Sequence, residues 1–264
     1  MKEDASAFQL KYNGIVVIQS LPDDEKQTGT ILYDDIISRR CDQNGHGKYF
    51  YNPTSKNDLI EVLNTVCNNV LYDDLLPILH FEIHGLEHGL GLKNGDHVLW
   101  KELQDYCRLI NVKAKNQLII TLATCWGSSI WEMIDIGVPA PYWGYIGPRE
   151  KIGTGDLMLD FGEFYDSLLT EQSWDKALKR LVENGNRQKY IYLHSKGIFE
   201  YYIEKNYKGT KINKHETFKR LFGQTKDHYP GLNRAERKKR LKNNLAEFNR
   251  ESFIAKMKKT FLMT

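Results

Sequence analysis

The chain has 264 residues, of which 37 are Lys or Arg and 34 are Asp or Glu, for a net charge of +3. This length suffices for one large domain, or for a smaller domain with an extension, and in both cases for a sizeable hydrophobic core. No apolar run reaches the roughly 18–20 residues that cross a bilayer, and acidic residues stand where a secretory signal would be apolar. These observations argue against a membrane-spanning or secreted protein, so we expect a cytoplasmic one.

The charge is divided unevenly along the chain. Residues 186–264 carry 20 Lys and Arg against 7 Asp and Glu, whereas residues 1–185 carry 17 against 27. An acidic body with a basic arm would produce this division. We therefore predict two parts, a folded domain over residues 1–185 and a basic helical extension over residues 186–264.

Strands and helices alternate along the first part of the chain. The clearest helix begins after Ser55, which stands three residues before Asp58 as in a capping box and is followed by apolar residues at helical spacing. The expected elements are a strand over 14–22, a helix over 28–40, a strand over 48–53 and a helix over 55–76.

The alternation continues as far as residue 185. The expected elements are a strand ending at His84, a hairpin around Asn94-Gly95, a helix over 100–111, a strand ending at Cys125, a short helix over 126–137, a strand over 139–148 and one or two helices over 155–185. This order predicts the α/β class, with a mainly parallel sheet flanked by helices. From residue 186 the pattern is aromatic and helical, and residues 233–259 are rich in Lys and Arg.

Two of the predicted strands end in reactive residues. The run LPILHFEI ends at His84-Gly85, and the run QLIITLAT ends at Cys125. Reactive groups of an open α/β sheet collect beyond the carboxyl ends of its strands, so these two side chains are expected to meet there. An imidazole beside a thiol can accept its proton, and the thiolate attacks carbonyl carbon. The N-terminus of the short helix after Cys125 would favour the thiolate further. The pair therefore indicates a cysteine peptidase.

The other three cysteines show no pattern of their own. Cys41, Cys67 and Cys107 lie far from one another and from Cys125, without the close spacing of a zinc ribbon, and nothing indicates secretion. Cys67 and Cys107 fall on apolar faces of predicted helices and are expected in the core. No disulfide framework is indicated.

Four features occur in order along residues 14–185, roughly two thirds of the chain: the strand ending in His84-Gly85, the hairpin after it, the motif LATCWGSS, and the segment FYDSLLTEQSWDKALKRL. In these features the chain resembles the caspase-like cysteine peptidases, and among them the CHAT branch related to separase. The resemblance implies that His84 is the general base and Cys125 the nucleophile, with the backbone N–H groups of Gly85 and Cys125 forming an oxyanion hole. It also implies that neither a metal nor an organic cofactor is needed.

The resemblance makes less specific statements about substrate and context. An acidic residue that binds Arg or Lys before the scissile bond would be Asp156 or Glu150, whereas Ala123 stands where related enzymes often carry Asp, two residues before the cysteine. Cleavage after Asp therefore stays open. CHAT relatives commonly act as regulated effectors in prokaryotic antiviral defence or cell death, which implies a protein substrate and a separate sensor or activator protein.

A zinc peptidase is an alternative. His84, Glu87 and His88 spell H-x-x-E-H, the inverted zinc-peptidase signature, and Glu163 could supply a third ligand. That signature needs a helix, so that both imidazoles share one face. Here it follows a strand-like run and contains glycine, which is poor helix sequence.

Non-catalytic alternatives also stay open. A pseudoenzyme would keep both reactive residues without turnover. The basic C-terminal segment could dock on the acidic body, bind a partner protein, or contact nucleic acid through its Lys and Arg residues, in that order of preference, since no known nucleic-acid-binding module accompanies it. An adaptor that binds a partner or nucleic acid, without enzymatic activity, is thus the non-enzyme alternative.

Overall fold

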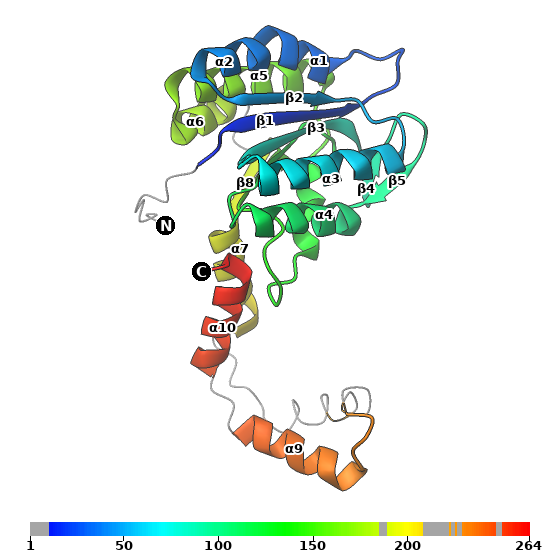
Figure 1. Ribbon diagram of the computed structural model, residues 1–264, viewed down its shortest axis with the longest axis vertical. Coiled ribbons are helices and arrows are strands. Elements are labelled where there is room, and N and C mark those ends of the chain that lie inside the picture. The colour runs from blue at the N-terminus through cyan, green and yellow to red at the C-terminus, as the bar shows by residue number, and fades with distance from the viewer. Residues whose placement is uncertain (1–10, 185–188, 208–221, 223–224, 226–228, 247–249) are drawn as a thin grey trace.

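The computed structural model describes residues 11–184, 189–207, 222, 225, 229–246 and 250–264. Its centre is an eight-stranded sheet, in which six strands follow the order β2-β1-β3-β6-β7-β8 and the two short strands β4 and β5 extend from β3 (Figure 1). The strands are β1 (Gly14–Ser20), β2 (Gly47–Tyr51), β3 (Pro77–Leu86), β4 (Gly89–Gly91), β5 (His97–Leu99), β6 (Ile119–Leu122), β7 (Gly144–Pro148) and β8 (Tyr190–His194).

The pairs from β2 to β7 along this order are parallel, β8 is antiparallel to β7, and β4 and β5 form an antiparallel hairpin with the end of β3. The described helices are α1 (Thr28–Leu32), η1 (Tyr33–Ile37), α2 (Ser38–Asn44), α3 (Lys56–Tyr72), α4 (Trp100–Lys113), η2 (Gly127–Met133), α5 (Thr154–Glu171), α6 (Trp174–Asn184), α7 (Ser195–Tyr207), α9 (Arg234–Ala246) and α10 (Arg250–Leu262). The predicted α/β class, with a mainly parallel sheet flanked by helices, is confirmed.

Helices cover both faces of the sheet (Figure 1). The alternation of side chains along β1 explains how both faces are filled: Val16 and Ile18 pack with α3 and α4, while Ile15 and Val17 pack with α1, α2, α5 and α6. All seven residues of β1 are buried, as expected for a strand covered on both sides.

The N-terminus of α3 forms as the sequence predicts. The Ser55 hydroxyl accepts a hydrogen bond from the backbone N–H of Asp58 at 3.1 Å, and the Asp58 carboxylate accepts one from the Ser55 N–H at 2.9 Å. These hydrogen bonds satisfy two backbone groups that a helix end would otherwise leave unpaired. They also hold the pKa of Asp58 below its ordinary value.

Two predicted elements differ from the structure. The helix expected over 28–40 is interrupted by the π-helix η1 and continues through α2 to Asn44. Tyr190–His194 forms β8, although the sequence indicated that a helical extension starts at residue 186. The run YIYLH is rich in β-branched and aromatic residues and is too short to separate a strand from a helix by periodicity alone. The sheet therefore extends past residue 185.

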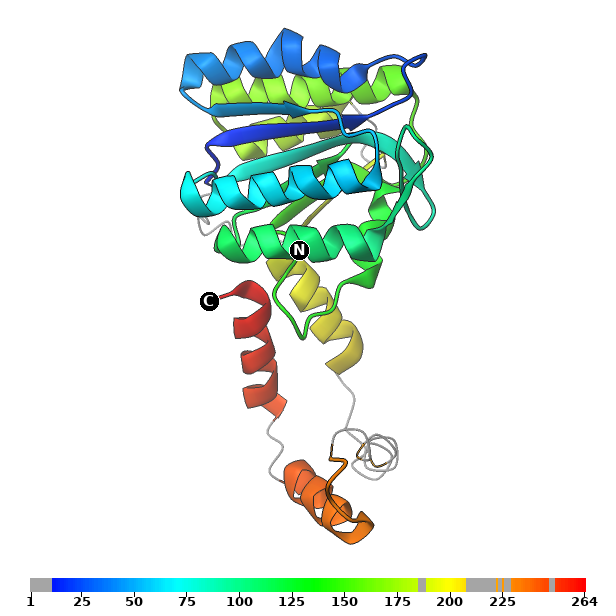
Figure 2. The ribbon, with the colours of Figure 1, turned by 45° about the vertical axis from the view of Figure 1, so that its right-hand side comes forward.

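The last helix returns to the sheet body. Phe261 and Leu262, at the end of α10, are buried, and the Phe261 ring stacks on Phe199 of α7 at 6.0 Å. The Phe261 carbonyl accepts a hydrogen bond from the Ala140 N–H at 2.9 Å, and the Leu262 carbonyl accepts one from the Asn116 amide at 3.1 Å. α7 and α10 run side by side, whereas α9 lies well away from the sheet (Figures 1 and 2). In the described residues, no helix is long and apolar enough to cross a membrane.

Candidate active site

Three neighbouring strands bring the candidate residues to one edge of the sheet. In the order β1-β3-β6, the loop after β1 carries Glu25, β3 carries His84 near its end, and Cys125 follows the end of β6 by three residues. Because these strands are parallel, their carboxyl ends lie at the same edge, where loops replace packed side chains.

The register of β3 and β6 leads both chains to the same edge, with His84 and Cys125 at equal positions past the paired residues. The last regular pair is Phe81 with Leu122, and the pairing continues with a 2.9 Å hydrogen bond from the Ala123 N–H to the Phe81 carbonyl. His84 and Cys125 are each three residues past that last pair. The β6 strand ends earlier than predicted, at Leu122, but its direction still leads to Cys125.

Gly85 lies directly against the backbone of Cys125. A Cβ atom added at Gly85 would lie 1.6 Å from the Cys125 carbonyl oxygen and 2.6 Å from the Thr124 hydroxyl oxygen. A side chain therefore cannot be accommodated at residue 85 without moving the backbone of one segment. The structure thus brings Gly85, the residue after His84, against the backbone of Cys125.

The chain turns sharply after Cys125. Trp126 has a φ of 59°, in the left-handed region, and its side chain is 48% exposed. Such a conformation is uncommon for a bulky residue and is often found at functional sites. The helix that follows, η2, is a seven-residue 3-10 helix rather than an α-helix. Its dipole therefore adds little to the stabilisation of a thiolate. The short helix predicted over 126–137 is thus present only as η2.

The His84 imidazole is held by a residue that the sequence analysis missed. Its Nε2 atom lies 2.9 Å from one carboxylate oxygen of Glu25 and 3.1 Å from the other, and both side chains are about half exposed. A carboxylate beside Nε2 favours the tautomer with the proton on Nε2, which leaves Nδ1 free to accept a proton. The ring makes no hydrogen bond to the Cys125 thiol, although both residues are described.

The loop that carries Glu25 is fixed from within. Gln27 donates to the Glu25 carbonyl at 2.9 Å and to the Pro22 carbonyl at 2.7 Å, and its own side-chain oxygen accepts from Gln19 at 2.7 Å. Gln19 is fully buried on β1. The position of Glu25 therefore depends on a chain of hydrogen bonds that begins in the sheet.

A buried polar network lies upstream of His84 on the same face of β3. His80 contacts the Thr121 hydroxyl at 2.8 Å and Glu82 at 3.1 Å, and Glu82 accepts from the Thr28 hydroxyl at 2.7 Å. The Tyr165 hydroxyl contacts Thr121 at 2.8 Å. The network links α1 and α5 to β3 and β6. The sequence signal that could have revealed it is the i, i+2 series of His80, Glu82 and His84, which share one face of a strand.

The two residues predicted to bind substrate lie at the same edge of the sheet but do not contact His84 or Cys125. Glu150 is exposed, two residues after the end of β7. Asp156, in the first turn of α5, pairs with Lys189 at 3.0 Å and is 61% exposed. The Asp156 carboxylate therefore already has a cationic partner.

The inverted zinc motif does not adopt the geometry it needs. His84 lies in β3, which continues to Leu86, and His88 precedes β4, so the two imidazoles do not share a helix face. Glu87 and His88 are strongly exposed, with their charged atoms 4.0 Å apart. Among the described residues no group of three His, Cys, Asp or Glu side chains could hold a metal ion. The prediction that zinc catalysis is the less favoured alternative agrees with this backbone geometry.

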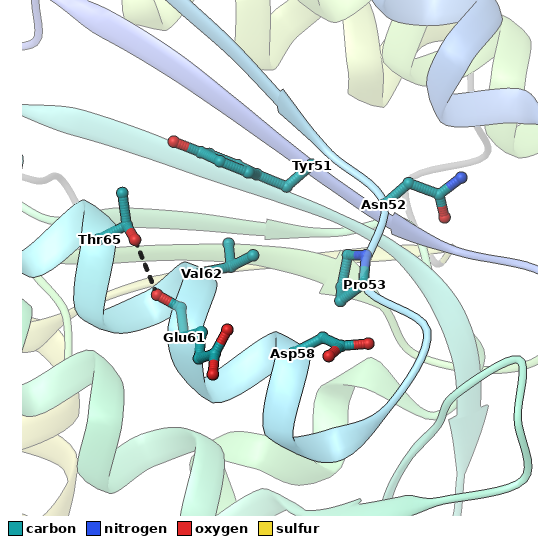
Figure 3. A pocket seen from close by; sticks show the side chains of 7 residues that line it. All are labelled: Tyr51, Asn52, Pro53, Asp58, Glu61, Val62 and Thr65. Atoms are coloured by element: carbon teal, nitrogen blue, oxygen red, sulfur yellow. Dashed lines mark hydrogen bonds between the residues drawn. The ribbon is translucent and has the colours of Figure 1, made fainter.

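Two hollows lie near the carboxyl edge. One, of about 290 Å³, follows His84-Gly85 directly in the chain and has a mainly apolar surface, lined by Leu86, Glu87, His88, Gly89, His97, Val98 and Leu99. The other, of about 360 Å³, lies between the end of β2 and α3 and is lined by Tyr51, Asn52, Pro53, Asp58, Glu61, Val62 and Thr65 (Figure 3). Neither lining includes His84 or Cys125.

No family model matches the sequence, and no curated protein matches it. One similar solved structure is caspase-1 from Spodoptera frugiperda, with 15% sequence identity and a TM-score of 0.46 over 74% of this chain and 92% of that chain. The function proposed below depends on the local geometry of His84, Gly85, Cys125 and Glu25.

Proposed function

We propose that the chain is a cysteine endopeptidase in which His84 is the general base and Cys125 the nucleophile. The observation that supports this proposal is the close approach of Gly85, the residue after His84, to the backbone of Cys125 at the carboxyl edge of a parallel sheet. A dyad at this edge is open to a peptide, since His84 is half exposed and Cys125 partly exposed.

The chemistry follows from the hydrogen bond of His84. Glu25 accepts a hydrogen bond from the Nε2–H group, so Nδ1 takes the proton of the Cys125 thiol and the thiolate attacks the peptide carbonyl. The oxyanion that forms accepts hydrogen bonds from the N–H groups of Gly85 and Cys125, each typically worth ~10²–10³ in rate. The C–N bond then breaks as His84 returns the proton to the leaving amine, and water activated by His84 hydrolyses the thioester.

The imidazole and the thiol must approach each other before they react, since they are not hydrogen-bonded in the free protein. Catalytic hydrogen bonds are often long without substrate and tighten in the complex. This fits a regulated effector of the CHAT type, switched on by a separate sensor or activator protein in the cytoplasm, in antiviral defence or cell death.

The substrate is a protein, and we expect a basic residue before the cleaved bond. Glu150 and Asp156 supply the negative charge at the carboxyl edge, with Lys189 leaving Asp156 when substrate binds. Ala123, two residues before Cys125, adds no charge. Cleavage after Asp is the alternative.

A peptide library prepared from a whole proteome tests the proposal. Wild-type protein is expected to create new N-termini after Lys or Arg, and Cys125→Ala is expected to create none above background. Identical cleavage by the two proteins would contradict the proposal. Loss of cleavage in His88→Ala or with a chelator would favour the zinc alternative instead.

The role of Glu25 makes a separate prediction. Glu25→Gln keeps the size of the side chain but removes the charge that orients His84, so kcat should fall about 10–100-fold with a smaller change in KM, while Glu25→Asp keeps part of the activity. Peptide hydrolysis kinetics measure both constants. Asp24→Asn is the matched control, because it removes the same charge from the same exposed loop. An equal loss in both variants would show that the loop acts by its overall charge and not through the contact with His84.

A further inference from the structure

The C-terminal helices carry a surface that peptide hydrolysis does not use. We call α9 and α10 together the basic arm. α9 contains six Lys or Arg residues and one Glu, and α10 contains four and one. The arm thus holds a net charge of +8 within 26 residues, against +3 for the whole chain.

The charges of the arm are not what attaches it to the body. α10 is fixed through the buried side chains of Phe261 and Leu262 and through hydrogen bonds to their backbone carbonyls. α9 lies away from the acidic sheet body in both views (Figures 1 and 2). Docking of α9 on the body, the first expectation from the sequence, therefore does not account for its charge.

Five cations of α9 are open to solvent. The exposed side chains are Arg234, Lys238, Lys239, Arg240 and Lys242. Among the described residues none of them pairs with a carboxylate, and Arg240 stacks over the Tyr229 ring at 4.6 Å. Within the part of the chain that the structure describes, these cations therefore face solvent without an ion-pair partner.

Their spacing makes a continuous row. Arg234, Lys238 and Lys242 follow one another at four-residue steps, so they share one face and lie about 6 Å apart along the helix axis. Like charges at this spacing destabilise a helix, which a bound polyanion would relieve. Duplex nucleic acid presents about one negative charge per 1.7 Å of its axis, so such a row meets phosphates in any register.

The composition of α9 favours nucleic acid over an acidic protein. Protein interfaces depend on a few buried aromatic or apolar anchors, with charges at the rim. α9 has no aromatic residue, and Leu241, in its middle, is already buried. Binding to a phosphate backbone requires only cations, which release condensed counterions.

We propose that the basic arm binds the phosphate backbone of nucleic acid, without reading its sequence, through the row Arg234, Lys238 and Lys242. This binding does not depend on the peptidase activity. It would hold the protein on an RNA or a DNA, and the two share the chemistry that the arm recognises.

The test is fluorescence anisotropy with the full chain, using labelled single-stranded RNA and duplex DNA of mixed sequence, between about 50 and 200 mM KCl. We expect micromolar binding whose logarithm falls linearly with the logarithm of salt concentration, equally for scrambled sequences. The triple variant Arg234→Gln, Lys238→Gln and Lys242→Gln should bind at least about tenfold more weakly at the lowest salt, with a duplex salt slope smaller by about two to three.

The matched control removes the same charge from exposed lysines elsewhere, in Lys113→Gln, Lys151→Gln and Lys196→Gln, and should stay within about twofold of wild type. Acetylation of lysines in the wild type, read by mass spectrometry, should show protection of Lys238 and Lys242 by nucleic acid, which tests the contact without any variant. The proposal is overturned by absence of salt-dependent binding, by equal losses in the two triple variants, or by tighter binding of poly-glutamate than of either nucleic acid.

Discussion

Replacing His84 with alanine is expected to lower the rate of peptide hydrolysis by at least about 10³-fold. Without the imidazole, no group takes the proton of Cys125, and none returns a proton to the leaving amine. The loss should appear in kcat more than in KM, because His84 acts on the reacting atoms. Steady-state kinetics on the best peptide from the library measure it.

His88→Ala is the control for this variant. His88 stands four residues later, its side chain is 73% exposed, and among the described residues its one charged partner is the neighbouring Glu87. It should retain wild-type activity within about twofold, whereas a zinc site built on the H-x-x-E-H motif would lose as much activity with His88→Ala as with His84→Ala. Retention of more than a tenth of the activity in His84→Ala would contradict the assignment of the general base.

Gly85→Ala is expected to cost both stability and activity. Its Cβ would stand 1.6 Å from the Cys125 carbonyl oxygen and 2.5 Å from the carbonyl carbon, so backbone must move, not merely a flexible side chain. We expect a free energy of unfolding lower by about 3 kcal/mol and, in the folded fraction, a loss of ~10²–10³ in rate as the oxyanion donors are displaced. Urea unfolding and kinetics below the transition measure the two effects.

Gly91 offers a matched control in the neighbouring strand β4. The three atoms nearest to a Cβ there all belong to the Leu86 side chain, the closest at 3.4 Å, which is ordinary contact. Gly91→Ala should therefore change the free energy of unfolding by less than about 1 kcal/mol and leave the rate nearly unchanged. If Gly85→Ala changes stability and rate as little as Gly91→Ala does, the close approach of Gly85 to the backbone of Cys125 is wrong.

The elements that carry the dyad could be predicted because each is specified locally. The buried runs that end at His84 and Cys125 are long enough to indicate strands, and the capping residues Ser55 and Asp58 mark the start of α3. A parallel sheet then requires these strand ends to meet at one edge, without further information.

Glu25 could not be predicted in this way. It stands beside Asp23 and Asp24 in a polar loop, and nothing in their sequence separates the three carboxylates. Its partner is 59 residues away, and its position depends on Gln27 and Gln19, which act only when the loop is folded over β1. The choice among neighbouring carboxylates is thus a tertiary property.

The strand β8 was missed for a different reason. Its five residues lie directly before α7 and share its aromatic pattern. In the sequence the two elements therefore resemble one helical segment. What separates them is pairing with β7, from Gly144 with His194 to Pro148 with Tyr190, and this contact is not local in sequence. Tertiary context overrides propensity here.

The cysteines offer the most direct test of the central claim. Burial raises the pKa of the Cys41 thiol to about 11 and that of Cys107 to about 12, and it also raises the pKa of Cys67. These thiols are therefore protonated at neutral pH and slow to react, since only the thiolate is nucleophilic. They serve as internal references for Cys125, which is partly exposed.

The measurement is the rate of iodoacetamide alkylation at each of the four cysteines, resolved by mass spectrometry, in the wild type and in His84→Ala. We predict that Cys125 reacts at least about tenfold faster than the other three at pH 7, and that His84→Ala slows Cys125 alone. Exposure by itself would also make Cys125 react faster with iodoacetamide. The effect of His84→Ala therefore distinguishes activation by His84 from mere exposure. Equal rates at Cys125 in the two proteins would contradict the dyad.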